Sequence, residues 1–317
     1  MQIQTERFLT WRKRRKLLNK EKQRRKNPIM DWIEVILSAV VIVFLINQYF
    51  FQAYMIPSGS MEETLKIKDR IFVNKLIYGP ELLPGIVKIP GFPKPERGEI
   101  IIFENPHYIS KGTLFDIVHR FLYMLTFTLV DIDRDPSGAP AHHFLIKRAV
   151  AVPGDRIRTD RGNMEFLPAG ETEWIPEAAM QERLGLEYPV RRLLEPAIYQ
   201  DFEILAAAEA LEDAGLEVPF STAASRQAIG GRYPDEYFDT EVWNRVRYQI
   251  SPHVNRFGRE WLRSRLGWYI GRDHVFPMGD NRDNSRDARY FHAVRMEKVL
   301  GRASFRFWPI TRFGGIR

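Results

Sequence analysis

The most prominent feature of the chain is an abrupt change from charged to apolar residues. No charged residue occurs from Val35 to Met61, and the apolar run begins at about Ile29. A transmembrane helix needs about 20 apolar residues to cross a hydrocarbon core of about 30 Å. The pattern therefore predicts a transmembrane anchor over residues 29–52, preceded by a basic tail over residues 1–28.

A cleavable export signal is the alternative explanation of this run. The charged region before it is too long for such a signal, the apolar run is longer than usual, and no small-x-small cleavage pattern follows. We therefore expect an uncleaved, single-pass anchor. Because Lys and Arg that flank a span stay on the cytoplasmic side, the N-terminus is expected in the cytoplasm and everything after about residue 52 on the other side.

After the anchor, apolar and β-branched runs alternate with turn-forming residues, which is typical of β-strands. The pattern predicts an antiparallel β domain with coiled sheets, built from residues 53–167 and 271–317. The proline-rich segment 84–95 is expected to be an extended surface loop. The strand-like runs are residues 70–75, 99–103, 144–152 and 303–309.

Residues 168–270 differ in pattern from the rest of the chain. Three stretches have amphipathic helical spacing, and the first is followed by Gly215, a typical helix stop. We therefore predict a largely helical insertion, for which the sequence suggests no chemistry. The fold class expected is mainly β: an N-terminal transmembrane helix, then an antiparallel coiled-sheet domain that carries the insertion. The helical stretches are residues 203–214, 241–250 and 256–266.

The segment 113–130 interrupts the β pattern with apolar residues at helical spacing. Asp116, His119 and Arg120 would make a second complete membrane span costly. We therefore expect a helix that either lies in the membrane interface or packs on the β domain.

The charge of the chain is unevenly distributed. The net charge is +7, but residues 1–30 hold 11 Lys/Arg and 2 Asp/Glu, which leaves 36 Lys/Arg against 38 Asp/Glu in residues 31–317. The basic tail can contact anionic lipid headgroups, whereas a basic groove for nucleic acid on the folded domain is not expected. The absence of cysteine excludes disulfides, thiol catalysis and cysteine–zinc sites.

Ser60 lies at the end of the apolar run, and a nucleophilic serine needs a base to accept its proton. The seven histidines are scattered, and Ser60 is not within a G-x-S-x-G turn. His142 and His143 are expected in a solvated loop, because no H-E-x-x-H helix is present. Residues 280–284 are not a calcium loop, because Arg282 stands where an oxygen ligand is required. No metal site is expected.

Lys147 is the other candidate base. A free lysine with a pKa of about 10.4 is neutral in only about one molecule in a thousand at pH 7.4, and burial lowers that pKa. Lys147 lies inside the apolar run 144–152. Adjacent strand residues face opposite sides, so an inward Lys147 predicts a solvent-facing Arg148. On this pattern alone, an outward Lys147 on an amphipathic strand is the simpler interpretation.

Several sequence blocks change that balance, because together and in this order they resemble bacterial type I signal peptidase. They cover roughly residues 52–75, 97–103, 144–157 and 275–309, and Glu63 stands where that family commonly has a proline. The blocks are Ser58-Gly59-Ser60-Met61, Arg97-Gly98-Glu99-Ile100, Lys147-Arg148 running to Pro153-Gly154-Asp155, and Gly279-Asp280-Asn281-Arg282-x-Asn284-Ser285-x-Asp287-x-Arg289.

The resemblance implies a role for each matching residue. Ser60 would be the nucleophile and Lys147 the general base of a serine protease. The Ser58 hydroxyl would stabilise the oxyanion, and Ser285 would orient the lysine amine. Four further residues would give structural support: Asp280, Arg282, Asp287 and Arg289.

The resemblance also implies the substrate and the location. Preproteins with signal peptides would bind as an added strand, with small side chains in shallow pockets, and no cofactor would be needed. The enzyme would sit in the inner (cytoplasmic) membrane, in contact with lipid, with its catalytic domain on the extracytoplasmic side. The candidate pocket residues are Ile56, Met61, Leu65 and Ile146.

Two other functions are compatible with parts of the sequence. One is a different Ser–Lys protease, such as a self-cleaving repressor-type enzyme, although the anchor and the block 279–289 argue against it. The other is a membrane-tethered, β-rich binding or assembly factor in which Ser60 is only a turn residue. Cleavage of a preprotein by the wild type and by Ser60 and Lys147 variants separates the three.

Overall fold

The structure of the protein is a computed structural model. The predicted basic tail lies largely outside the described residues, as do His142 and part of the proline-rich segment 84–95. The structure describes residues 11, 13–16, 28–83, 87–89, 91, 93–126, 128–135, 138, 141, 143–168, 170–219, 222–230 and 235–316.

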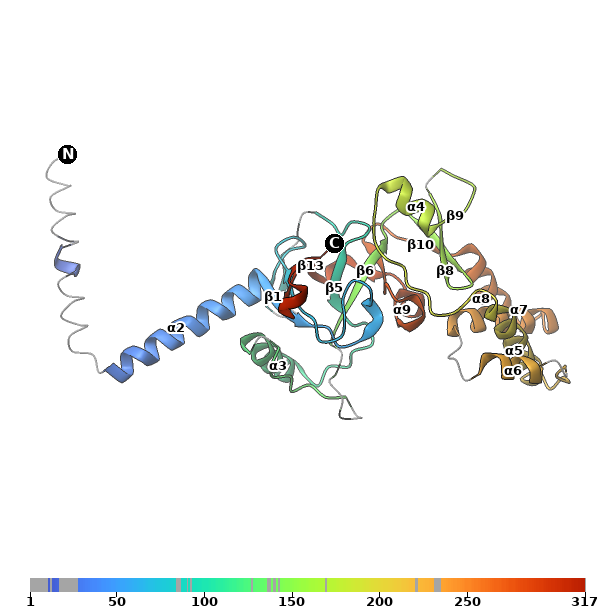
Figure 1. The fold of residues 1–317 in the computed structure, drawn as a ribbon, viewed down its shortest axis with the longest axis horizontal. Helices are drawn as coiled ribbons and strands as arrows, with labels where there is room; N and C mark the ends of the chain where they lie inside the picture. Colours follow the sequence, from blue (N-terminus) through green and yellow to red (C-terminus); the bar gives the residue numbers. More distant parts are fainter. Residues whose placement is uncertain are drawn as a thin grey trace.

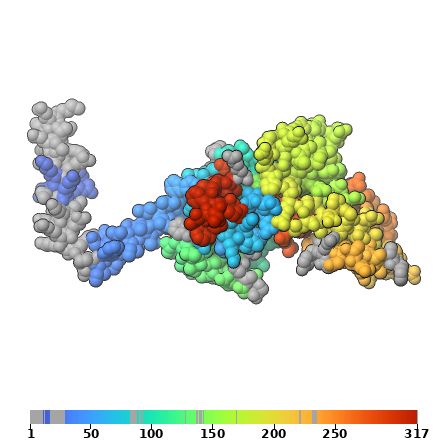
Figure 2. Space-filling view, viewed as in Figure 1, coloured from blue at the N-terminus to red at the C-terminus, as the bar shows by residue number. Residues whose placement is uncertain are grey.

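A long apolar helix, α2 (Pro28–Tyr49), projects from the rest of the protein (Figure 1). The space-filling view shows it as a narrow extension of the molecular body (Figure 2). Its segment Ile29–Tyr49 is long and apolar enough to cross a membrane, and the most apolar 18 residues of it include none that are buried inside the protein. Exposure of such an apolar helix to water is energetically costly, so the helix favours apolar surroundings.

The centre of the molecule is an eight-stranded antiparallel sheet that curls into a half-barrel. Its order is β1–β2–β13–β5–β6–β11–β12, with β14 beside β13. The C-terminal β13 therefore lies between β2 and β5, which joins the two halves of the domain. The strands are β1 Phe51–Met55, β2 Arg70–Asn74, β5 Ile100–Glu104, β6 Phe144–Ala151, β11 His274–Met278, β12 Val294–Arg295, β13 Val299–Trp308 and β14 Gly314–Gly315.

Two smaller sheets accompany the main sheet. One has four antiparallel strands in the order β10–β7–β8–β9, and the other pairs β3 with β4. Strands β9 and β10 stand at the two ends of the helical insertion, so this sheet holds both of its ends together. The strands are β3 Glu81–Leu83, β4 Val87–Lys88, β7 Arg156–Asp160, β8 Asn163–Leu167, β9 Ile175–Pro176 and β10 Trp268–Tyr269.

The insertion contains helices with a core of their own. Tyr199 and Phe202 of α5 pack against Phe238 and Val242 of α7. Helices α5–α8 lie at the end of the molecule opposite α2, whereas α4 lies beside β8 and β9 (Figure 1). The helices are α4 Glu177–Leu184, α5 Ile198–Glu212, α6 Thr222–Ile229, α7 Glu236–Ile250 and α8 Asn255–Leu266.

The remaining elements are short, apart from α3. They are α3 Thr113–Leu125, α9 Ala288–Phe291, and the 3-10 turns η1 Gly59–Met61, η2 Arg282–Asn284, η3 Met296–Lys298 and η4 Ile310–Arg312. The fold class expected from the sequence is thus confirmed: a mainly antiparallel β protein with an N-terminal apolar helix and additional helices.

Strand β6 corrects one prediction from the sequence. It pairs with β5 on one side and β11 on the other, and Ile146 and Ala149 belong to different buried clusters. Both faces of β6 are therefore covered, and Lys147 and Arg148 are both buried. The prediction that Arg148 faces solvent is wrong, because strict alternation between core and solvent holds only for a strand with one solvated face.

Candidate active site

The turn that carries Ser60 is held by its apolar neighbours. Ser60 lies in η1, shortly after β1. Ile56 and Met61, on either side of it, are buried in the same cluster as Leu65. The backbone of Ile56 is bonded in both directions, to Asp69 and from Lys68. The turn is therefore fixed by burial rather than by a long regular element.

The structure brings Lys147 to Ser60. The Lys147 Nζ atom lies 2.5 Å from the Ser60 Oγ atom, although the two residues are 87 positions apart. Lys147 is 4% exposed and Ser60 is 7% exposed. Burial lowers the pKa of Lys147 to about 8, although Asp287 and Asp280 act in the opposite direction. At neutral pH a useful share of this amine is therefore neutral.

A second buried lysine shows what distinguishes Lys147. Burial also lowers the pKa of Lys75 to about 8. Its Nζ atom, however, lies 3.1 Å from Gln52 Oε1 and 3.7 Å from a carboxylate oxygen of Glu81. Lys75 therefore has an acidic partner in place of a hydroxyl, whereas Lys147 contacts a serine directly.

Two further serines lie near the pair, with different contacts. The Ser58 hydroxyl donates to Ser60 Oγ at 3.4 Å. The Ser285 hydroxyl is buried and has no hydrogen-bond partner among the described residues, so it makes no hydrogen bond to Lys147. A Cβ atom at Gly279 would lie 2.3 Å from Ser285 Oγ and 2.5 Å from the Ser60 carbonyl oxygen. Gly279 thus permits this close approach, which a larger residue would block.

The segment 279–285 supports the back of the Ser60 turn. The Asn281 N–H donates to the Ser60 carbonyl at 3.1 Å, and its side-chain amide donates to the Gly59 carbonyl at 3.3 Å. The Gly279 N–H donates to Asp287 at 3.1 Å. Burial alone would raise the pKa of Asp287, but the adjacent Arg289 guanidinium holds it below its usual range.

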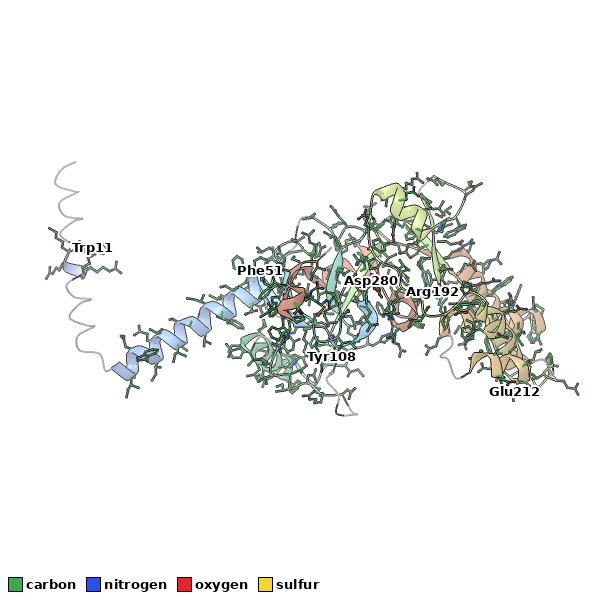
Figure 3. All side chains as sticks on the ribbon, viewed as in Figure 1. Trp11, Phe51, Tyr108, Arg192, Glu212 and Asp280 are labelled. Carbon is green, nitrogen blue, oxygen red and sulfur yellow. The ribbon has the colours of Figure 1, made fainter. Side chains whose placement is uncertain are left out.

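Arg148, which the sequence analysis placed in solvent, is a central part of this support. Its guanidinium makes two hydrogen bonds to Asp280, at 2.8 and 2.7 Å, and a third to Thr64 at 3.1 Å. It also lies over the ring of Tyr188 at 4.8 Å. Asp280 is completely buried, and Figure 3 shows it in the interior of the molecule. A buried arginine of this kind needs such an acidic partner.

The predicted support residues do not form one cluster of mutual pairs. Asp287 pairs with Arg289, whereas Asp280 pairs with Arg148. Arg282 pairs instead with Glu177 of α4, through contacts of 2.6 and 2.8 Å. Glu177 could not be predicted as a site residue, because a single Glu 105 positions from Arg282 has no local pattern that indicates this contact.

The insertion also reaches the Ser60 turn through Arg191. Its guanidinium lies 2.8 Å from Glu62 and 3.5 Å from Glu63. Its backbone donates to the Asp280 carbonyl and accepts from the Arg282 N–H. Glu63 has a φ of +88°, which a proline cannot adopt, so the turn here differs from one with proline at that position.

The four candidate pocket residues lie together. Ile56, Met61, Leu65 and Ile146 are each at most 8% exposed and belong to one buried cluster. They thus belong to the apolar core that borders Ser60 and Lys147 in the sequence, at residues 56, 61 and 65 and at residue 146.

A different cluster has the geometry of a metal site. His119, Asp133 and His143 each offer one ligand atom within 4.8 Å of the others. Arg120, however, lies 3.0 Å from His143 Nε2, and Lys111 lies 2.8 Å from Asp133. Cationic side chains thus already occupy positions beside two of the three residues.

His143 also corrects the expectation of a solvated loop. It is 7% exposed, and its ring stacks between Tyr108 and Phe144. The loop before α3 folds over it, a tertiary contact that the local sequence does not reveal.

Comparisons with known proteins agree on one family. The model of the family described as signal peptidase, peptidase S26, matches residues 29–166 and 228–308. A signal peptidase I of Haemophilus influenzae is 27% identical over 300 residues, covering 92% of this chain and 73% of that protein. A probable signal peptidase I-2 of Synechocystis is 25% identical, covering 92% and 81%. A signal peptidase I of Aquifex aeolicus is 24% identical, covering 86% and 80%.

Proposed function

The chain belongs to the signal peptidase, peptidase S26, family, and we propose that it cleaves signal peptides with Ser60 as nucleophile and Lys147 as general base. The observation that carries this proposal is the 2.5 Å contact between Lys147 Nζ and Ser60 Oγ inside the protein. With a pKa of about 8, about a tenth of the lysine is neutral at pH 7, against less than one part in a thousand for a free lysine.

The proposed reaction has two halves. In the first, neutral Lys147 takes the Ser60 proton as Oγ attacks the scissile carbonyl carbon, and the protonated amine then gives that proton to the leaving amino group. The product is an ester between Ser60 and the signal peptide. In the second, Lys147 takes a proton from water as the water oxygen attacks the ester carbon. The protonated amine then returns that proton to Ser60 Oγ as the ester bond breaks, which releases the new C-terminus of the signal peptide and restores the enzyme.

The remaining site residues have supporting roles in this proposal. The Ser58 hydroxyl and the Ser60 N–H stabilise the oxyanion, and the buried Ser285 hydroxyl orients the lysine. Asp280, Arg282, Asp287 and Arg289 hold the block behind the turn. An extended substrate adds as a strand beside the Ser60 and Lys147 segments, with small side chains above Ile56, Met61, Leu65 and Ile146.

We further propose how the chain is placed in the cell. Helix α2 spans the inner membrane with residues 1–28 in the cytoplasm, because the basic excess precedes the span. Residues 53–167 and 271–317 then form the extracytoplasmic catalytic domain, with 168–270 as its insertion. Preproteins held in the same bilayer by their signal segments meet the site at a raised effective concentration.

Purified full-length protein in detergent with a preprotein substrate tests the dyad. Ser60→Ala and Lys147→Ala are expected to abolish cleavage, whereas Ser225→Ala, at a buried serine of α6, should cleave like the wild type. Undiminished cleavage by either dyad variant would disprove the assignment. Failure of the wild type to cleave any preprotein would favour a binding protein instead.

A further inference from the structure

Helix α3 exposes an apolar face. Leu114, Ile117, Val118 and Phe121 have exposed side chains, with Leu114 at 77%. Their spacing of three and four residues places them on one side of the helix. Beyond the helix, Leu129 is also 72% exposed. Water would have to solvate this whole surface, which soluble domains generally avoid.

The charged residues of α3 turn away from that face. His119 is buried and lies 3.0 Å from Asp131. Arg120 is buried and lies 3.4 Å from both Glu81 and Glu104. Asp116 accepts hydrogen bonds from Tyr108 and Ser110. Each charged side chain of α3 thus has a partner within the protein, and the outward face carries none of them.

Helix α3 lies against the end of α2 that enters the β domain. The rings of Phe44 and Phe121 are 5.2 Å apart. Phe44 is five residues before the end of α2 at Tyr49, which corresponds to about 7.5 Å along a helix axis. Figure 1 draws α2 along its length and α3 nearly end-on beside it, so the two helices cross.

We propose that α3 lies in the plane of the membrane, with its apolar face in the outer leaflet. The inference rests on the proposed span by α2, because a bilayer around α2 reaches the level of Phe44 and therefore of Phe121. An in-plane helix buries its apolar side about 5–10 Å into the headgroup and acyl boundary, which matches this depth. A protein partner would have to displace lipid from that level to reach the same face.

This second attachment fixes the orientation of the catalytic domain. A single helix leaves the domain free to rotate and tilt about its connection to the membrane. Two contacts with the bilayer, at α2 and at α3, hold Ser60 at a constant height and direction. The cleavage site of a membrane-held substrate then meets Ser60 at a fixed distance from the bilayer.

The absence of native cysteine makes single-site spin labelling direct. Full-length protein in phosphatidylethanolamine/phosphatidylglycerol vesicles is labelled at Leu114→Cys, Val118→Cys, Val41→Cys of α2 or Leu262→Cys. Leu262, a 53% exposed leucine of α8, is the matched control. Electron paramagnetic resonance then measures how strongly two paramagnetic reagents relax each spin label. The reagents are oxygen, which concentrates in lipid, and a water-soluble nickel complex.

The labels at Leu114 and Val118 are expected to report lipid, like Val41, while Leu262 reports water. Water exposure at Leu114 and Val118 with lipid exposure at Val41 would overturn the α3 proposal and leave the anchor. Exclusion of both probes at Leu114 and Val118 would indicate a protein partner, and would overturn it too. Water exposure at all four would overturn the anchor and the α3 contact together.

A cleavage assay gives an independent readout. The double variant Leu114→Ser/Val118→Ser should cleave a short soluble peptide in detergent like the wild type, which also shows that it folds. In vesicles, cleavage of a bilayer-held preprotein should fall about tenfold, because two apolar side chains no longer favour the lipid. Equal rates to wild type in vesicles, or an equal loss in both settings, would contradict the proposal.

Discussion

At the scale of single residues, the reactivity proposed here depends on where an ordinary side chain is placed. Lys147 and Lys75 are both buried, and burial lowers the pKa of both to about 8. Only Lys147 has a serine oxygen at hydrogen-bond distance, whereas Lys75 faces Glu81. Burial therefore makes both lysines possible bases. Only a neighbouring hydroxyl, such as that of Ser60, gives the base a proton to accept.

The rate of cleavage should follow the neutral form of Lys147. With a pKa of about 8, kcat/KM should rise about tenfold per pH unit below pH 8 and level off above it. A pH series from 6 to 10, with a peptide substrate in detergent, measures this. A rate that is constant between pH 6 and pH 8 would be inconsistent with a lysine base of this pKa.

The same pKa predicts an effect on stability. The unfolded lysine keeps its proton up to about pH 10.5, whereas the folded one loses it near pH 8. The unfolded state thus binds more protons between these values, so stability rises with pH across that window. Below pH 8 the folded state carries a cost of about 3 kcal/mol.

Lys147→Met removes that cost, so its melting temperature should exceed that of the wild type at pH 7. The gain should shrink as the pH approaches 10.5. Thermal unfolding in detergent at pH 7 and pH 10 measures both, with Lys66→Met, at an exposed lysine, as the control. A gain equally large at both pH values would show that charge burial is not its cause.

Ser58 is expected to act in the transition state. Its hydroxyl lies 3.4 Å from Ser60 Oγ, and loss of an oxyanion donor typically costs about 10²-fold or more in kcat. Ser58→Ala should therefore lower kcat strongly with little change in KM, and Ser58→Thr should recover much of the rate. A rise in KM with unchanged kcat would assign Ser58 to ground-state binding instead.

At the scale of elements, the insertion is tied to the candidate site. Glu177 of α4 pairs with Arg282, and the chain near Arg191 exchanges backbone hydrogen bonds with residues 280 and 282. Arg192 pairs with Asp283, and Figure 3 shows Arg192 where the insertion meets the β domain. The insertion therefore contributes contacts to the block behind Ser60.

Glu177→Gln tests the strength of that attachment. The change leaves Arg282, 2% exposed, without its carboxylate, and such an unpaired buried charge costs about 3–5 kcal/mol. Denaturant unfolding should show this loss. Glu297→Gln breaks the exposed pair with Arg295 and should cost less than about 1 kcal/mol. Similar values for both variants would refute the proposed importance of the buried pair.

At the scale of the whole molecule, the two ends of the protein are expected on opposite sides of the membrane. A membrane-impermeant thiol reagent should label Leu262→Cys in intact spheroplasts, because the proposed topology places α8 on the extracytoplasmic side. Lys13→Cys should react only after the membrane is permeabilised. Labelling in the reverse order would show the opposite orientation.

The sequence alone was sufficient for the features that depend on local patterns. An apolar run of membrane length predicted α2, and β-branched runs predicted β2, β5, β6 and β13. Gly215, predicted as the stop of a helix over 203–214, lies three residues after α5 ends at Glu212. Such features are readable because each one is encoded in neighbouring residues. The choice of Ser60 and Lys147 was of another kind, because it came from the resemblance of several motifs in order to a known family; the strand pattern around Lys147 alone favoured an outward lysine.

Only the tertiary structure decided which distant groups meet. It buried Arg148 against Asp280 and brought Glu177 to Arg282, and it turned the charged residues of α3 inward. The pairs Arg148–Asp280 and Glu177–Arg282 join residues 132 and 105 positions apart. They form because charges in a closed core must find partners there. A single sequence does not encode that choice locally, since it depends on which faces the completed sheet leaves open.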